Sequence, residues 1–190
     1  MDCNGGKPLS DAELAERVHR RDPQGCDEFI SRYHAGVFRY MVSLTGRSED
    51  AEDLAIQTMA RAVEKIRKFN GRSSLKTWVH SIAYHQFTHW HRLRRFELAL
   101  DATQVAQDAA FEAIDAVEDL RSALSRLPTE LRQAFVMHEI NELSVDDIAL
   151  IEQIPVGTVK SRLHAARLRL RELISPQEEA NDVQPVMESR

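Results

Sequence analysis

The stretch VGTVKSRLHAARLRLREL, residues 156–173, decides how the C-terminal part of the chain folds. At about 100° per residue its apolar side chains gather on one stripe of a helix. That stripe holds Val159, Leu163, Ala166, Leu170 and Leu173. Residues 156–171 contain no carboxylate, and cations flank the stripe on both sides: Lys160, Arg162, Arg167, Arg169 and Arg171. The whole protein has a formal net charge of -5, so this helix concentrates positive charge against the overall balance.

Two further helix signals precede this stretch. Pro128 is typical of a helix start, and the pattern that follows predicts a helix ending near Asn141. Ser144 stands three residues before Asp147, which is the spacing of a capping box. Pro155 then interrupts the pattern before the basic helix, so the order is helix, turn, helix. A basic surface helix is often only a solvated face, but this context favours DNA binding.

The composition predicts an all-α protein. Of the 190 residues 43% are apolar and 6% aromatic, and seven Gly and six Pro are too few for the turns of an all-β fold. Cys3 and Cys26 are the only cysteines, so we expect no disulfide framework. The sequence shows no secretion signal and no apolar run long enough for a bilayer. We expect a cytoplasmic protein with no membrane insertion.

Charge changes sign along the chain in blocks. Residues 61–95 hold nine Lys and Arg against Glu64 alone, whereas residues 97–119 hold seven carboxylates and no cation. The acidic block has weak periodicity and resembles a flexible linker. We therefore expect two small helical domains, at 10–96 and 120–175, joined by an acidic linker at 97–119. Residues 1–9 and 176–190 are predicted to be disordered ends.

The N-terminal domain has two informative helices. The first is predicted to be capped by Ser48, with an acidic first turn and a polar ridge opposite its apolar stripe. The second follows a break at residues 70–71 and is capped by Ser73 or Ser74. Its predicted buried side comprises Leu75, Trp78, Val79, Ile82, Ala83, Gln86, Trp90 and Leu93. Its remaining face interleaves Tyr84 and Phe87 with cations, a pattern that favours single-stranded nucleic acid.

Residues 127–173, LPTELRQAFVMHEINELSVDDIALIEQIPVGTVKSRLHAARLRLREL, resemble region 4 of the extracytoplasmic-function (ECF) group of bacterial RNA polymerase sigma factors. The resemblance implies that this helix-turn-helix reads the minus-35 promoter element as duplex DNA. The implied contact residues are Thr158, Lys160, Ser161, Arg162, His164 and Arg167. One departure is that Glu152 and Gln153 stand where the family usually carries an apolar residue and Gly.

Two N-terminal stretches are similar to region 2 of the same family. DAEDLAIQTMARA, residues 50–62, resembles the surface that grips the clamp helices of the polymerase's largest subunit, which implies Asp50, Asp53 and Gln57 as contacts. The family's common Gln-Glu pair here reads Ile56 and Gln57. FNGRSSLKTW, residues 69–78, resembles the loop and helix start that capture a base flipped out of the minus-10 element. The implied minus-10 residues are Asn70, Gly71, Arg72, Ser73, Ser74, Lys76, Thr77, His80 and Tyr84.

The resemblance further implies core RNA polymerase, including the flap of its second subunit, promoter DNA and an anti-sigma factor as partners. A polymerase-independent helix-turn-helix regulator is the alternative, but it needs a dimer seam that the sequence does not show. His85 and His89, spaced i and i+4, could bind zinc in a metal-dependent hydrolase. The cationic surroundings oppose that, so we expect no catalytic residue, no metal and no cofactor.

Overall fold

The structure is a computed structural model that describes residues 9–100 and 116–174, and all regular elements within these ranges are helical. The N-terminal group comprises α1 (Asp11–His19), α2 (Pro23–Thr45), α3 (Ser48–Lys65), a 3-10 turn η1 (Ile66–Lys68) and α4 (Leu75–Leu100). The C-terminal group comprises α5 (Ala116–Ser125), α6 (Thr129–Phe135), a π-helical turn η2 (Val136–Ile140), α7 (Val145–Glu152) and α8 (Val156–Ile174). The predicted all-α class is confirmed.

The predicted linker lies partly inside these helices. Residues 97–100 continue α4 and residues 116–119 begin α5. The remainder of that linker lies outside the described residues, as do residues 1–8 and 176–190 of the ends predicted to be disordered, and residue 175.

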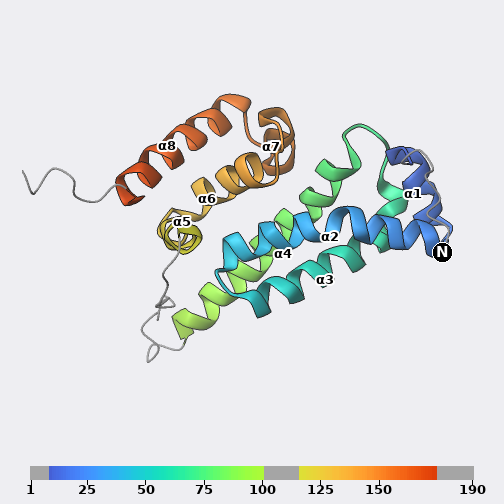
Figure 1. Cartoon of the computed structure of the whole chain (residues 1–190), viewed down its shortest axis with the longest axis horizontal. Helices are drawn as coiled ribbons and strands as arrows, with labels where there is room; N and C mark the ends of the chain where they lie inside the picture. The colour runs from blue at the N-terminus through green and yellow to red at the C-terminus, as the bar shows by residue number, and fades with distance from the viewer. Residues whose placement is uncertain (1–8, 101–115, 175–190) are drawn as a thin grey trace, which may run out of the picture.

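The N-terminal group packs around α2, which lies against α1, α3 and α4 (Figure 1). The buried row of α4 follows i, i+4 spacing through Leu75, Val79, Ala83 and Phe87, each 0% exposed. From α2, Phe29 and Val37 add fully buried side chains to the same core. Burial of this apolar surface is the main source of stability for such a bundle.

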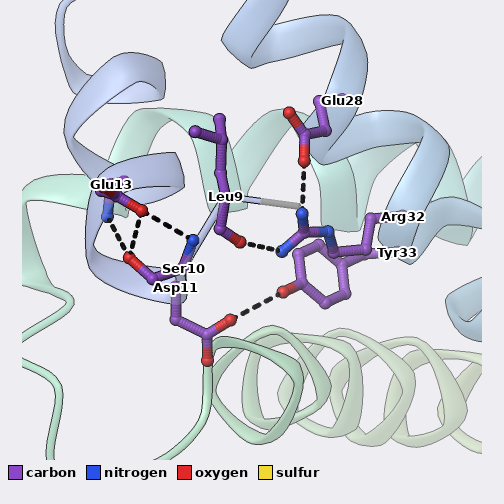
Figure 2. A network of polar contacts seen from close by, with 7 residues as sticks. All are labelled: Leu9, Ser10, Asp11, Glu13, Glu28, Arg32 and Tyr33. Atoms are coloured by element: carbon purple, nitrogen blue, oxygen red, sulfur yellow. Dashed lines mark hydrogen bonds and ion pairs between the residues drawn. The ribbon is translucent and has the colours of Figure 1, made fainter. Parts of the chain in front are cut away.

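Hydrogen bonds fix α1 to the start of α4. Ser10 and Glu13 form a capping box at the beginning of α1 (Figure 2). Tyr33 on α2 donates its hydroxyl to Asp11 Oδ1 at 3.4 Å. The other oxygen of the same carboxylate accepts the backbone N–H of Leu75 at 2.6 Å. Asp11 therefore ties three helices together beside the loop that precedes α4.

The helix-turn-helix has the predicted local geometry. Ser144 and Asp147 form the expected capping box at the start of α7. Gln153, at the family's usual glycine position, adopts the left-handed conformation with φ 57°. A side chain there costs about 1 kcal/mol, which glycine would avoid. The apolar stripe of α8 is buried at Val159, Leu163, Ala166 and Leu170.

Three sequence predictions for the N-terminal group need correction. Ser48 begins α3 itself, and Arg47 is the N-cap without a side-chain bond. Phe87, placed on the exposed face by the sequence, is fully buried because it continues the i, i+4 row of α4. Leu93, predicted to be buried, is 46% exposed because it lies towards the C-terminal end of α4, beyond the last fully buried residue of that row. The cap of α4 is Ser74, whose hydroxyl accepts the Thr77 N–H at 3.0 Å.

Candidate nucleic-acid interface

The first turns of α8 present a polar face. Lys160, Ser161, His164 and Arg167 are exposed, and Thr158 and Arg162 are half-buried. Ser161 donates its hydroxyl to the Thr158 carbonyl at 2.9 Å, which keeps its side chain close to the helix. The structure therefore brings the predicted minus-35 residues onto one helix, with small side chains beside Lys160. A major groove accepts such a helix.

Two of these cations already have carboxylate partners. Arg162 pairs with Glu152, whose side chain is 1% exposed. Burial raises the pKa of Glu152, and the Arg162 charge opposes that rise. Arg167 Nη2 lies 2.5 Å from Glu139 Oε1, and this hydrogen bond lowers the pKa of the Glu139 carboxyl. Lys160 has no polar partner among the described residues, so among the lysine and arginine side chains of the predicted minus-35 set it is the one most readily offered to a phosphate.

The loop before α4 is open to solvent and shaped by its own backbone. Asn70 Oδ1 accepts the Arg72 N–H at 3.2 Å, and Gly71 has φ 72°. Glycine suits that left-handed position because it has no side chain to clash. Asn70 and Gly71 line a hollow of about 420 Å³ between the loop and α1. This volume lies within the range of small-ligand sites, roughly 300–1,000 Å³.

The first turns of α4 are less accessible than their predicted role requires. Thr77 and His80 are each only 2% exposed, while Lys76 and Tyr84 are half-buried. Thr77 donates its hydroxyl to Asp147 Oδ1 of α7 at 2.9 Å. The predicted minus-10 residues therefore fall into two parts. Those at 70–74 lie in an open loop, whereas those on the first turns of α4 are covered by the C-terminal group.

His80 provides a pH-dependent contribution to stability. Burial lowers the pKa of its imidazole from 6.5 to about 4. Unfolding restores the ordinary pKa, so the unfolded chain binds more protons between these values and stability falls as the pH drops from 6.5 towards 4. We expect the free energy of unfolding to fall by about 3 kcal/mol across this pH window. A His80→Gln variant should not show this fall. Urea unfolding of both proteins at several pH values measures the difference, and parallel profiles would contradict it.

The predicted polymerase contacts lie on α3. Asp53 and Gln57 are exposed, while Asp50 is half-buried beside Arg47, with Oδ2 to Nε at 3.5 Å. Ile56, which replaces the first residue of the family's Gln-Glu pair, is 54% exposed. This surface therefore combines an acidic edge with an apolar side chain, Ile56, that is not among the predicted contacts. The side chain of Ile56 is exposed because it lies off the apolar stripe of α3.

The histidines of α4 and the hydropathy of the helices can be inspected directly within the described part of the chain. His85 and His89 are both exposed. Within residues 9–100 and 116–174, no cluster of three or more His, Cys, Asp or Glu side chains has metal-binding geometry. The described helices include none with the length and hydropathy of a bilayer span.

Sequence reasoning missed the residues that join the two groups of helices. Asn141, at the end of η2, donates Nδ2 to the Gly36 carbonyl of α2 at 2.8 Å. Asp147 was identified for its capping role, but not for its bond to Thr77. A capping box is local and readable from i, i+3 spacing, whereas these contacts join residues separated by 105 and 70 positions. Tertiary packing alone determines them.

Comparison with known proteins decides the family. Residues 29–97 match the family model described as Sigma-70 region 2, and residues 118–170 match the model described as Sigma-70, region 4. The ECF RNA polymerase sigma-E factor of Haemophilus influenzae is 30% identical over 184 residues, covering 88% of this chain and 97% of that protein. The chain belongs to the ECF family of sigma factors. It initiates transcription with RNA polymerase and is not an enzyme.

Other relatives give the same result. The RNA polymerase sigma-H factor of Pseudomonas aeruginosa is 30% identical over 183 residues, covering 87% of this sigma factor and 94% of that protein. Among solved structures, sigma factor RpoE in complex with the anti-sigma factor NepR, from Bartonella quintana, has a TM-score of 0.71 at 27% identity. That match covers 78% of this chain and 95% of the RpoE chain.

A second solved structure shares the fold. CnrH, in complex with the cytosolic domain of CnrY, has a TM-score of 0.67 at 20% identity and covers 86% of this chain and 96% of that one. At this level of identity the match supports the helical architecture alone.

Proposed function

We propose that this sigma factor divides promoter recognition between its two groups of helices. The C-terminal group, with α8 in the major groove, reads the minus-35 element as duplex DNA. The loop at residues 70–74 and the first turns of α4 hold the melted minus-10 strand. The observation that carries the proposal is Lys160, which is exposed on a capped helix-turn-helix and has no polar partner within residues 9–100 and 116–174.

Different surface chemistry supports the two assignments. The start of α8 combines the small side chains of Thr158 and Ser161 with Lys160, which suits base edges flanked by phosphates. The loop contributes a hollow beside Asn70 and the exposed cation Arg72. A hollow of this kind can hold one base removed from the stack. Hydrogen bonds and stacking in the hollow then offset the free-energy cost of flipping the base.

Docking on the polymerase is assigned to α3, with the clamp helices of the largest subunit against Asp50, Asp53 and Gln57. The apolar side chain of Ile56 adds area to that contact. The C-terminal group is assigned to the flap of the second subunit. The complex of RpoE with NepR supports an anti-sigma factor as a further partner. The cytoplasm, where the polymerase acts, is the proposed location.

Reconstitution with core RNA polymerase tests this function. We expect discrete transcripts from a promoter library only when both proteins are present, from start sites preceded by two shared elements. An Asp53→Lys variant should lose most of this activity because it reverses the charge of the polymerase-docking face. Glu52→Lys makes the same change on the neighbouring exposed residue and should stay near wild type.

Two outcomes of the reconstitution count against the proposal. Absence of transcripts, with binding of the free chain to inverted repeats, would favour the polymerase-independent regulator. Equal loss in the two α3 variants would remove the assignment of Asp53 to the docking face.

A further inference from the structure

One arginine of α8 lies away from the face that carries Lys160 and Ser161. Arg162 stands three residues after Val159 and four before Ala166, and both of these side chains are 0% exposed. At about 100° per residue, the Arg162 side chain therefore leaves α8 close to the buried stripe and roughly 100° from that of Ser161. Only 24% of the Arg162 side chain is exposed. Arg162 thus lies at the inner edge of α8, where this helix packs against α7.

Glu152, the last residue of α7, holds this guanidinium. Arg162 Nη1 donates a hydrogen bond to Glu152 Oε2, and the Glu152 side chain is 1% exposed. A short turn brings the two residues together, because the backbone N–H groups of Gln153 and Ile154 both donate to the Ala149 carbonyl and close α7. Both partners belong to the C-terminal group, so the ion pair stays with α8 when that group binds DNA.

Stability alone does not account for a carboxylate at position 152. Glu152 Oε1 is buried without a hydrogen bond to any described residue, and a buried acceptor without a partner is costly. A buried ion pair is often no more stabilising than a well-packed apolar pair of similar volume. What the Glu152 carboxylate adds to the fold is a fixed place for the Arg162 guanidinium.

The ion pair between Glu139 and Arg167 differs from this one in its burial. The side chains of Arg167 and Glu139 are 52% and 37% exposed. An exposed ion pair is weak, so Arg167 can exchange Glu139 for a phosphate of the DNA. Separating a buried pair is strongly unfavourable, because it leaves a buried charge without compensation. Arg162 therefore cannot leave Glu152 for DNA as readily as Arg167 leaves Glu139.

We propose that Glu152 is a positioning residue for minus-35 recognition and keeps Arg162 away from the DNA. Base reading is left to the exposed side chains of the same turns, Lys160, Ser161 and His164. An unrestrained arginine at this place would pair with guanine, because a guanidinium donates two N–H groups to guanine O6 and N7 in the major groove. Glu152 thereby prevents an additional guanine preference. The inference rests on the proposed minus-35 role of α8 and adds a residue of α7 that restricts its specificity.

Substitutions at the ion pair test this restraint. Glu152→Leu removes the carboxylate and releases Arg162 from α7. Glu152→Gln removes the charge but keeps the shape of the side chain, so it serves as a second variant if leucine disturbs the packing. Glu152→Leu/Arg162→Met replaces both partners with apolar side chains, so no cation remains to be released. Asp146→Asn controls for the lost negative charge, because Asp146 is an exposed carboxylate on the same helix.

Holoenzymes reconstituted with core RNA polymerase are compared on templates with a randomised minus-35 element, and sequencing of the transcribed templates gives the base preference at each position. We expect Glu152→Leu to gain a preference of about tenfold for guanine at one position, the usual value for one bidentate contact. Glu152→Gln should gain a smaller one, and the double variant and Asp146→Asn none. Replacing that guanine with 7-deazaguanine, which lacks the N7 acceptor, should remove most of the gain.

The inference is overturned if Glu152→Leu and Glu152→Gln both keep the wild-type preference, or if the double variant also gains the guanine preference, because the gain would then not come from Arg162. It is also overturned if the double variant loses the wild-type preference, since Arg162 would then already read the element. Failure of the proposed function has a different outcome. A wild-type holoenzyme that initiates equally from every minus-35 sequence would remove the minus-35 role of α8 itself.

Discussion

A Phe87→Ala variant loses about 3–5 kcal/mol of unfolding free energy, the usual cost of removing a buried aromatic side chain. Phe87 is 0% exposed and ends the i, i+4 row of α4. Its ring lies 5.8 Å from that of Trp90 and 5.6 Å from that of His91, measured between centroids. The truncation removes these contacts together with those to the core. Urea unfolding followed by circular dichroism measures the loss.

Phe96→Ala is the matched control on the same helix. Phe96 is 63% exposed, so its removal should change stability by no more than about 0.5 kcal/mol. The pair separates a core role for Phe87 from the base-stacking role suggested by the sequence. A stable Phe87→Ala protein with weakened binding to single-stranded DNA would contradict the packing that the structure shows.

Lys160→Glu reduces transcription from promoters with a minus-35 element by about 10- to 100-fold, the range for losing one well-placed DNA contact. Lys160 is exposed on the first turns of α8 and has no polar partner among the described residues. Charge reversal there also places a carboxylate against a phosphate or an acceptor on a base. Initiation by the reconstituted holoenzyme on a linear duplex promoter measures the effect.

Arg169→Glu controls for the change in net charge. Arg169 is exposed on the same helix, farther from its N-terminus. Because the proposed groove contacts lie at residues 158–167, Arg169→Glu should retain most of the activity. If the two variants are equally impaired, α8 acts as a general cationic surface and does not read a specific element.

Local signals in the sequence were sufficient for much of the fold. The Ser144–Asp147 capping box depends on three-residue spacing and forms as predicted. The stripe of α8 depends on helical periodicity, and Val159, Leu163, Ala166 and Leu170 are buried as expected. Phe87 was wrongly assigned to the exposed face of α4. Helical periodicity gives the direction of a buried face, but the width of that face depends on how many neighbouring helices surround α4.

The candidate site was less predictable than the fold. The exposure of Lys160 follows from its position beside an apolar stripe, and the loop at residues 70–74 follows from Asn70 and Gly71. The burial of Thr77 depends on Asp147, a partner 70 positions away that no local pattern identifies. Whether a predicted contact residue is accessible is therefore a property of how the two groups of helices pack.

One transcription experiment tests the division of promoter recognition most directly. Lys160→Glu and Asn70→Asp holoenzymes are compared on a promoter with both elements intact, and on versions with either element scrambled. Asn70→Asp keeps the oxygen that accepts the Arg72 N–H, so the loop retains its turn. We predict that Lys160→Glu causes no further loss once the minus-35 element is scrambled, and that Asn70→Asp causes none once the minus-10 element is scrambled. If both variants respond to the same element, the two groups of helices do not read separate parts of the promoter.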